Sequence, residues 1–308
     1  MKIKFIISFF TIIAAILQGL LYVNAADKNH VTQLRETMHC MECDLSSENL
    51  EGAQLKGSNL AKVNLKTAIL RNSNLEDANL INSNLEKADL ARASLSNIKL
   101  QGSNLEATNL SNSTMRSANI SQVNLMRANL SFIDASDSNF SYSNLSSSDL
   151  SNAILKNTNF KSAILDKVDL SKADMGRANL FGASIKNGKL MNVNLSNAFM
   201  KAANLSGADL TGANLSKAKL STANLEGANL TNANLNKANL ARNIIRVNLK
   251  GANLTGASFI GANLKGANLS GANLTGANFT DSNLKKTKLD NVTYCRTIMP
   301  KGERNDDC

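Results

Sequence analysis

The chain has 308 residues, of which 43% are hydrophobic, 17 are glycine and only one is proline. This apolar content is too high for a disordered tract, and Asn, Leu, Ala and Ser recur too regularly for an ordinary globular domain. The formal net charge is +10, and internal repeats are the first feature to seek in such a chain.

Residues 1–25 have the composition of a secretory signal peptide. Lys2 and Lys4 precede an apolar run over 5–23, and Val23 and Ala25 supply the side chains expected before a cleavage site after Ala25. We expect cleavage there because no basic stop-transfer cluster follows. An uncleaved anchor is the alternative, since the run is nearly long enough to span a bilayer. Either way the chain is expected to be exported, to a periplasm, a lumen or the extracellular space.

Residues 26–42 carry no repeat and form an expected N-terminal cap segment, with a short helix within 26–39. From residue 43 a large apolar residue recurs every five positions, beginning with Leu45, Leu50 and Leu55, and this register continues to Leu240. A small or β-branched residue lies two positions before each, and Asn or Asp usually separates the two. The unit predicted for residues 43–292 is therefore A-N-L-x-x.

A period of five fits neither an α-helix nor a flat strand. Successive leucines would spiral around a helix, and they would alternate between the two faces of a strand. Both conflicts disappear if the chain turns a corner once per repeat, so that two residues point inward and three point outward. Stacked coils then bury the leucines as ladders, and each repeat depends on its neighbours.

Two lapses interrupt the pattern. At Ile133 and Ala135 the large and small residues exchange positions, which roughly keeps the inward volume. Between Leu240 and Leu249 one residue is missing, so the segment around Ile244 makes a four-residue step. We interpret this as a tolerated deletion at one tight corner, with a kink or docking point as the alternative.

Residues 293–308 leave the repeat, contain the single proline and form an expected C-terminal cap. Two cysteines lie at each end of the array and none lies within it: Cys40, Cys43, Cys295 and Cys308. An even number in an exported chain indicates disulfides, and the count alone leaves three pairings open.

Runs such as residues 203–210, ANLSGADL, resemble the pentapeptide-repeat family, and the resemblance covers roughly residues 43–292. It implies an all-β fold, a right-handed four-sided β-helix with short non-repeat caps. Four sides give 20 residues per coil, hence about 12 coils and a rod of about 60 Å. Residues 40–45, CMECDL, are similar to the C-x-x-C-D-L start of exported members, although Met41 and Glu42 replace the Pro-Gly of a common C-P-G-C. Residues 294–302 look like the C-terminal cap of those members.

In such a rod the two ends lie beyond the reach of a disulfide, so the compatible pairs are Cys40 with Cys43 and Cys295 with Cys308. A redox or metal role at Cys40 and Cys43 is the weaker alternative. The thioredoxin-like helix context is missing, and a zinc site would need both nearby histidines, His30 and His39, as well. We expect no catalytic, cofactor-binding or metal-binding residue and no enzyme activity.

The two halves of the array differ in charge. Residues 44–150 contain 9 Lys and Arg against 11 Asp and Glu, whereas residues 151–294 contain 18 against 7. With 20 residues per coil, one outward column contains Lys161, Phe181 and Lys201, and Phe199 and Lys219 lie across the same face. These five residues form the candidate partner patch, because outward phenylalanines beside lysines are typical of contact surfaces.

The sequence therefore predicts an exported, non-enzymatic structural or interaction protein. Its partner is expected to be an unidentified protein or an anionic envelope component, such as a glycan or lipid headgroup, that binds the basic C-terminal half. We expect no nucleic-acid partner and no membrane span after signal cleavage, and the sequence leaves open whether the chain is a monomer or a dimer. The family's topoisomerase-binding DNA mimics offer an alternative, but they need an acidic surface and a cytoplasmic location.

Overall fold

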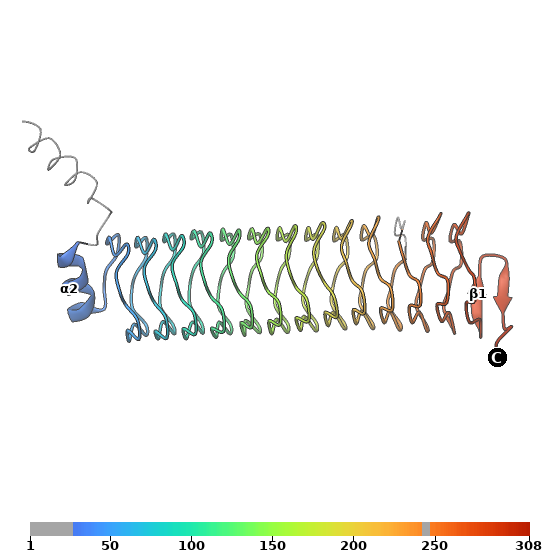
Figure 1. Ribbon diagram of the computed structural model, residues 1–308, viewed down its shortest axis with the longest axis horizontal. Coiled ribbons are helices and arrows are strands. Elements are labelled where there is room, and N and C mark those ends of the chain that lie inside the picture. The colour runs from blue at the N-terminus through green and yellow to red at the C-terminus, as the bar shows by residue number, and fades with distance from the viewer. Residues whose placement is uncertain (1–26, 242–246) are drawn as a thin grey trace, which may run out of the picture.

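The computed structural model describes residues 27–241 and 247–308, and these form one column of stacked coils with a cap at each end (Figure 1). The signal peptide predicted over 1–25 and the predicted four-residue step at Ile244 lie outside the described residues. In the part of the chain that is described, no helix has the length and apolarity that a membrane span needs.

Helix α2, Lys28–Thr37, covers the first coil (Figure 1). The carboxylate of Asp27 caps the helix by accepting a hydrogen bond from the backbone N–H of Asn29 at 2.9 Å. Met38 ends the helix in the left-handed conformation, and its N–H donates to the carbonyl of Leu34. Since Leu34 is buried against the core, the helix shields the exposed edge of the first coil from solvent.

Parallel backbone bridges join residues 20 positions apart, from the pair His39 and Asn59 to the pair Lys219 and Asn239. Each five-residue side contributes one bridged residue, so four sides complete a coil. This confirms the four-sided β-helix expected from the sequence. The bridges continue to Ile298 and define about thirteen coils rather than about twelve, because bridged residues extend into both cap segments.

Every described corner between sides places a residue with positive φ at the same position of a tight turn. The N–H of Ser58 donates to the carbonyl of Leu55 at 3.1 Å, and Gly57 between them has a φ of +68°, as a type II turn requires. Most corners place a residue other than glycine in this conformation, including Lys62 and Phe132. Each such residue costs roughly 1 kcal/mol, which the hydrogen bonds between coils must offset.

The core is a narrow column of the large and small inward residues. Leu165 is fully buried, whereas its neighbour Ile164 is 45% exposed on the outside of the same side. Both Ile133 and Ala135 are fully buried, so the exchange of large and small residues there keeps both positions inward. Phe140 and other inward aromatic residues stack on equivalent residues one coil away, at ring-centroid distances of 5.1 Å for Phe140–Phe160 and 4.8 Å for Phe259–Phe279.

The outward asparagines of the repeat have a structural role. The Oδ1 atom of Asn214 accepts a hydrogen bond from the N–H of Ser216 at 3.1 Å, which fixes the following corner. The Nδ2 atom of Asn214 donates to Asn194 of the previous coil at 3.2 Å, and Asn234 of the next coil donates to Asn214 at 3.4 Å. The asparagines therefore connect coils through side chains as well as through backbone.

The register changes once. The bridge that starts at Asn229 ends 19 residues later at Asn248, and the 20-residue spacing returns with the pair Asn248 and Asn268. One residue is thus missing between the described residues on either side of 242–246, in agreement with the deletion expected from the sequence.

The chain ends in a two-stranded antiparallel sheet, β1 (Thr297–Met299) and β2 (Gly302–Arg304), which covers part of the last coil (Figure 1). Tyr294 exchanges backbone and side-chain hydrogen bonds with Asp307, at 2.8 and 2.6 Å. The guanidinium of Arg304 lies 3.7 Å from the centre of the Tyr294 ring. These contacts hold the C-terminal tail against the rod.

Replacement of Leu165 by Asp should cost roughly 3–5 kcal/mol, because it places an unpaired carboxylate in the core column. The matched control is Ile164→Asp, which introduces the same group one residue away on the outside. Thermal unfolding followed by circular dichroism should show a large drop in midpoint for the first variant only. Equal midpoints for the two variants would contradict the inward assignment of Leu165.

Replacement of Asn214 by Ala removes the acceptor of the corner hydrogen bond and both links to neighbouring coils. We expect a loss of about 1–3 kcal/mol in chemical unfolding. Asn236→Ala is the control, since Asn236 is a corner residue whose side chain makes no hydrogen bond with the described residues. If both variants unfolded at the same denaturant concentration, the asparagine links would not contribute to stability.

Candidate binding face

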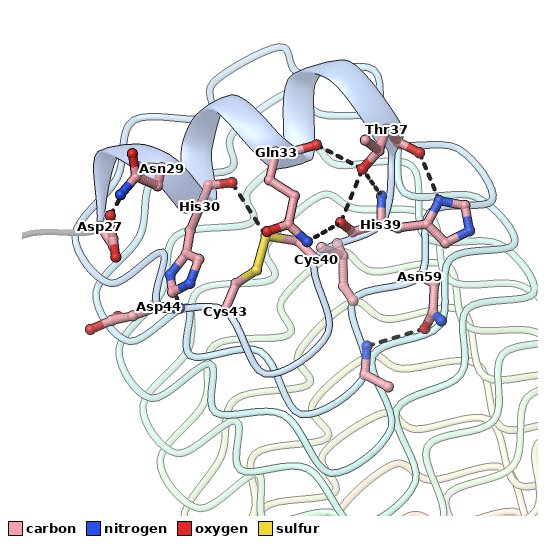
Figure 2. Close-up of a disulfide and its surroundings, with 12 residues drawn as sticks. Asp27, Asn29, His30, Gln33, Thr37, His39, Cys40, Cys43, Asp44 and Asn59 are labelled. Carbon is pink, nitrogen blue, oxygen red and sulfur yellow. Dashed lines mark hydrogen bonds between the residues drawn. A yellow bond between two sulfur atoms is a disulfide. The ribbon is translucent and has the colours of Figure 1, made fainter.

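The two cysteines at the N-terminal end form a buried disulfide between Cys40 and Cys43 (Figure 2). Cys40 is 0% exposed and Cys43 is 2% exposed, and helix α2 lies over the bond. The side chain of Gln33 donates to the carbonyl of His39 at 3.0 Å and so attaches the helix to the chain just before Cys40. A disulfide enclosed in this way has the environment of a structural link, since reactive cysteines are accessible to their reaction partners.

The histidines near this disulfide are held by backbone. The Nδ1 atom of His30 accepts a hydrogen bond from the N–H of Asp44 at 3.1 Å, and the Nδ1 atom of His39 lies 2.7 Å from the carbonyl oxygen of Thr37 (Figure 2). Burial alone would raise the pKa of Asp44, but hydrogen bonds from Ser46 and Asn64 outweigh it and the pKa lies below its ordinary value. Among the described residues, no group of His, Cys, Asp and Glu has the arrangement of a metal site.

The second disulfide joins Cys295 to Cys308 in the C-terminal cap. It closes a loop that contains the β1–β2 sheet and holds the last residue of the chain beside the end of the repeats. The two disulfides link the same pairs that the rod geometry favoured, and each one fixes the cap at its own end.

The structure brings together the five residues of the candidate patch. The rings of Phe181 and Phe199 stack at a centroid distance of 5.8 Å with 9° between their planes. Lys219 is the bridge partner of Phe199 in the next coil. Backbone hydrogen bonds place Lys161 and Lys201 in the coils on either side of Phe181, in the same column.

The patch is the centre of a larger surface, the basic face, which comprises the outward residues of 156–162, 176–182, 196–202, 216–222 and 236–241. These segments form the same side of five successive coils, because backbone N–H groups of each donate to carbonyls of the next. The exposed basic residues of this surface are Lys156, Lys161, Arg177, Lys201, Lys217, Lys219 and Lys237.

The basic face contains no Asp or Glu. The acidic residues within 156–241 all lie on the other sides of the rod, and they are Asp166, Asp169, Asp174, Asp209 and Glu226. Lys156 reaches around the corner to Asp174 at 3.2 Å, and among the described residues no other basic side chain of the face has a salt bridge. In the first half of the rod the same side contains paired cations, including Lys56 with Glu76 at 3.0 Å. Charge is therefore sorted by side only after about residue 150.

Four of these basic residues were missed by the sequence analysis: Lys156, Arg177, Lys217 and Lys237. They lie at or beside the corner before this side, whereas the predicted patch used only the middle of the side and the corner after it. In each coil these residues lie one or two positions after the large inward residue of the preceding repeat, such as Leu155 before Lys156. Including these two positions of every coil in the predicted patch would have found them. The signal was present in the sequence but lay in the previous repeat.

A shallow depression of about 360 Å³ borders the basic face at this corner. Its lining includes Gly176, whose missing side chain opens the corner, together with Lys156, Arg177 and the amides of Asn194 and Asn197. The lining is polar and carries one acidic residue, Asp174, already paired with Lys156. The depression therefore extends the basic face as a polar contact surface.

Comparison with protein families gives one match, described as Pentapeptide repeats (8 copies), at residues 39–77, 49–86, 68–106, 93–131, 103–141, 143–182, 165–197, 189–227, 223–259, 243–281 and 257–293. A search of the curated proteins found no significant match.

Similar solved structures include HetL, a pentapeptide repeat protein involved in heterocyst differentiation regulation from the cyanobacterium Nostoc sp. Strain PCC 7120. It is 26% identical over 86% of this chain and 90% of that chain, with a TM-score of 0.31. Rfr23 from the cyanobacterium Cyanothece 51142 is 34% identical over 36% of this chain and 86% of that chain, with a TM-score of 0.21. Trypsin-treated QnrB1, a plasmid-mediated fluoroquinolone resistance protein, is 24% identical over 65% of this chain and 90% of that chain, with a TM-score of 0.29. With TM-scores this low, these similarities carry no conclusion about partners.

The family match covers nearly the whole repeat array, and the chain belongs to the pentapeptide-repeat family, whose fold is the right-handed four-sided β-helix.

Proposed function

We propose that this chain is an exported, non-enzymatic interaction protein whose basic face binds an acidic component of the cell envelope. The observation that carries the proposal is the sorting of charge on the basic face, where seven basic residues occupy one side of five coils without a carboxylate among them. A surface of one sign attracts and orients a partner of the opposite sign.

The stacked rings of Phe181 and Phe199 support a contact role. Phe199 is 37% exposed. In the neighbouring coils its column contains mainly Asn or Lys, so the repeat itself does not require an exposed aromatic ring at this position. An apolar centre surrounded by polar and charged side chains is the usual arrangement of a binding surface. Each ring lies next to lysines of its own column, Phe181 between Lys161 and Lys201 and Phe199 beside Lys219, so the surface is both basic and partly apolar.

Export is supported by the signal-like segment over 1–25 and by the presence of disulfides at both caps. Disulfides persist in oxidising compartments and are rare in the cytosol. The DNA-mimic alternative requires an acidic rod, and residues 151–294 are strongly basic instead.

Export predicts a defined processed form. Protein isolated from its native host should begin at Ala26, and its four cysteines should resist alkylation until a reductant is added. Mass spectrometry of the intact and the digested protein measures both properties. A full-length chain with free thiols in the cytoplasmic fraction would overturn export and would revive the cytoplasmic alternative.

Charge reversal tests the binding role. In a pull-down from envelope extract, Lys161→Glu, Lys201→Glu and Lys219→Glu together should abolish capture of an anionic component that wild type retains at low salt. The matched control combines Lys167→Glu, Lys172→Glu and Lys186→Glu, three exposed lysines on other sides, and changes the net charge equally. Raising the salt concentration should release the component from wild type because mobile ions screen exposed charges. Equal capture by wild type and both triple variants would show that the basic face is not the binding surface.

A further inference from the structure

The exposed apolar side chains of the rod are concentrated on one side. Nine large hydrophobic residues are at least one-third exposed among the described residues, and five of them lie in three adjacent outward columns of the side that contains the basic face. We call these five the apolar row, and they are Met41, Tyr142, Phe199, Ile260 and Ile298.

Backbone contacts fix the alignment of the apolar row. The N–H of Tyr142 donates to the carbonyl of Lys161, and Phe199 is bridged to Asn179. Ile298 is bridged to Asn278 in the preceding coil, near the C-terminal cap. The row therefore runs from the first coil to the last along one side of the column.

The length of the row constrains the partner. A standard protein–protein interface covers about 800 Å² on each partner, a region roughly 30 Å across. About thirteen coils at the spacing of neighbouring strands give a rod of about 60 Å, and the apolar row extends along all of it. A flat, extended partner can contact such a row in full, whereas a compact globular partner covers only part of it.

The geometry of the aromatic pair leaves at most one face of each ring available to a sugar chain. Sugars stack on exposed ring faces, but Phe181 and Phe199 turn one face each toward the other at 5.8 Å. A partly exposed aromatic ring suits insertion between lipid headgroups, where the ring reaches the acyl boundary while flanking lysines pair with phosphates.

We propose that the basic face and the apolar row together dock the rod lengthwise on the surface of an anionic lipid bilayer. This inference rests on the proposed function and names its partner. The lysines supply attraction to lipid phosphates, and Tyr142, Phe199 and Ile260 supply shallow apolar contacts at intervals along the rod. The acidic residues within 156–241 lie on the other sides and face away from the bilayer, whereas Asp281 lies beyond the basic face in the column of Tyr142.

The test is co-sedimentation of protein purified from its native host with two kinds of vesicle. One kind contains phosphatidylcholine alone, and the other contains phosphatidylcholine with phosphatidylglycerol. Wild type should bind the anionic vesicles much more strongly than the zwitterionic ones. Because each basic residue near an anionic leaflet contributes roughly fivefold to partitioning, the triple variant Lys161→Glu, Lys201→Glu and Lys219→Glu should bind at least about 100-fold more weakly.

Two further variants separate the contributions. The control Lys167→Glu, Lys172→Glu and Lys186→Glu lowers net charge equally and should weaken binding only a few-fold. The double variant Phe181→Ser and Phe199→Asn uses residues found elsewhere in the same columns, such as Ser141 and Asn179, so the coils should fold normally. It should lower partitioning into anionic vesicles about tenfold while leaving the thermal midpoint unchanged.

Three results would overturn the lipid assignment. Equal effects of the two lysine triples would mean that net charge, not the basic face, controls binding. Equal binding to both kinds of vesicle would mean that lipid charge, and therefore the basic face, does not control docking. Absence of vesicle binding, together with capture of a soluble glycan or protein that depends on Lys161, Lys201 and Lys219, would keep the proposed function and replace the lipid by that partner.

Discussion

The hydrogen bonding between successive coils is the constraint on which the rest of the structure depends. The N–H of Leu165 donates to the carbonyl of Ser184 in the next coil, and the N–H of Ile164 donates to the carbonyl of Ser143 in the previous coil. A single coil can satisfy neither group by itself, so stability grows only as coils are added. The same constraint explains the caps, because the first and last coils lack one neighbour. Helix α2 covers one end, the β1–β2 sheet covers part of the other, and a disulfide fixes the chain at each.

This arrangement leaves the outside of the rod largely free to vary. Of the five residues in a repeat, two fill the core and one, commonly Asn, connects coils, whereas the two corner residues need only tolerate the turn. Lys217 and Lys237 occupy corners in the left-handed conformation, where glycine is found at the equivalent position of the next coil, Gly256. Side chains at these positions therefore reflect demands other than folding. That is why the sorting of charge on the basic face supports the proposed binding role, while an inward leucine gives no support to any function.

The inward register could be predicted from the period of five alone, because a straight helix or strand would turn Leu165 and Leu170 in different directions, whereas a chain that turns a corner once per repeat buries both. The number of sides could not, since three or four corners satisfy the same period, and that number came from the family resemblance. The position of Phe181 and Phe199 on one face followed from the 20-residue coil once four sides were assumed, whereas the stacking of their rings was not predicted. The links through Asn214 were not predicted, because they depend on the orientation of an amide that sequence does not specify. The extent of the basic face was also missed, since a side begins at a corner that belongs to the preceding repeat.

The missing residue near the end of the array shows how strongly the sides are fixed. A deletion in a helix rotates everything that follows, but here the column alignment survives it. The N–H of Leu240 donates to the carbonyl of Ser258, so the side that ends at Leu240 lies directly under the side that ends at Phe259. The described columns before and after the loss stay aligned, and Phe259 stacks on Phe279 in the restored 20-residue spacing. Ile260 consequently stays on the same side as the basic face. A surface built from columns can thus extend across a defect in the repeat, which an amphipathic helix of the same length could not do.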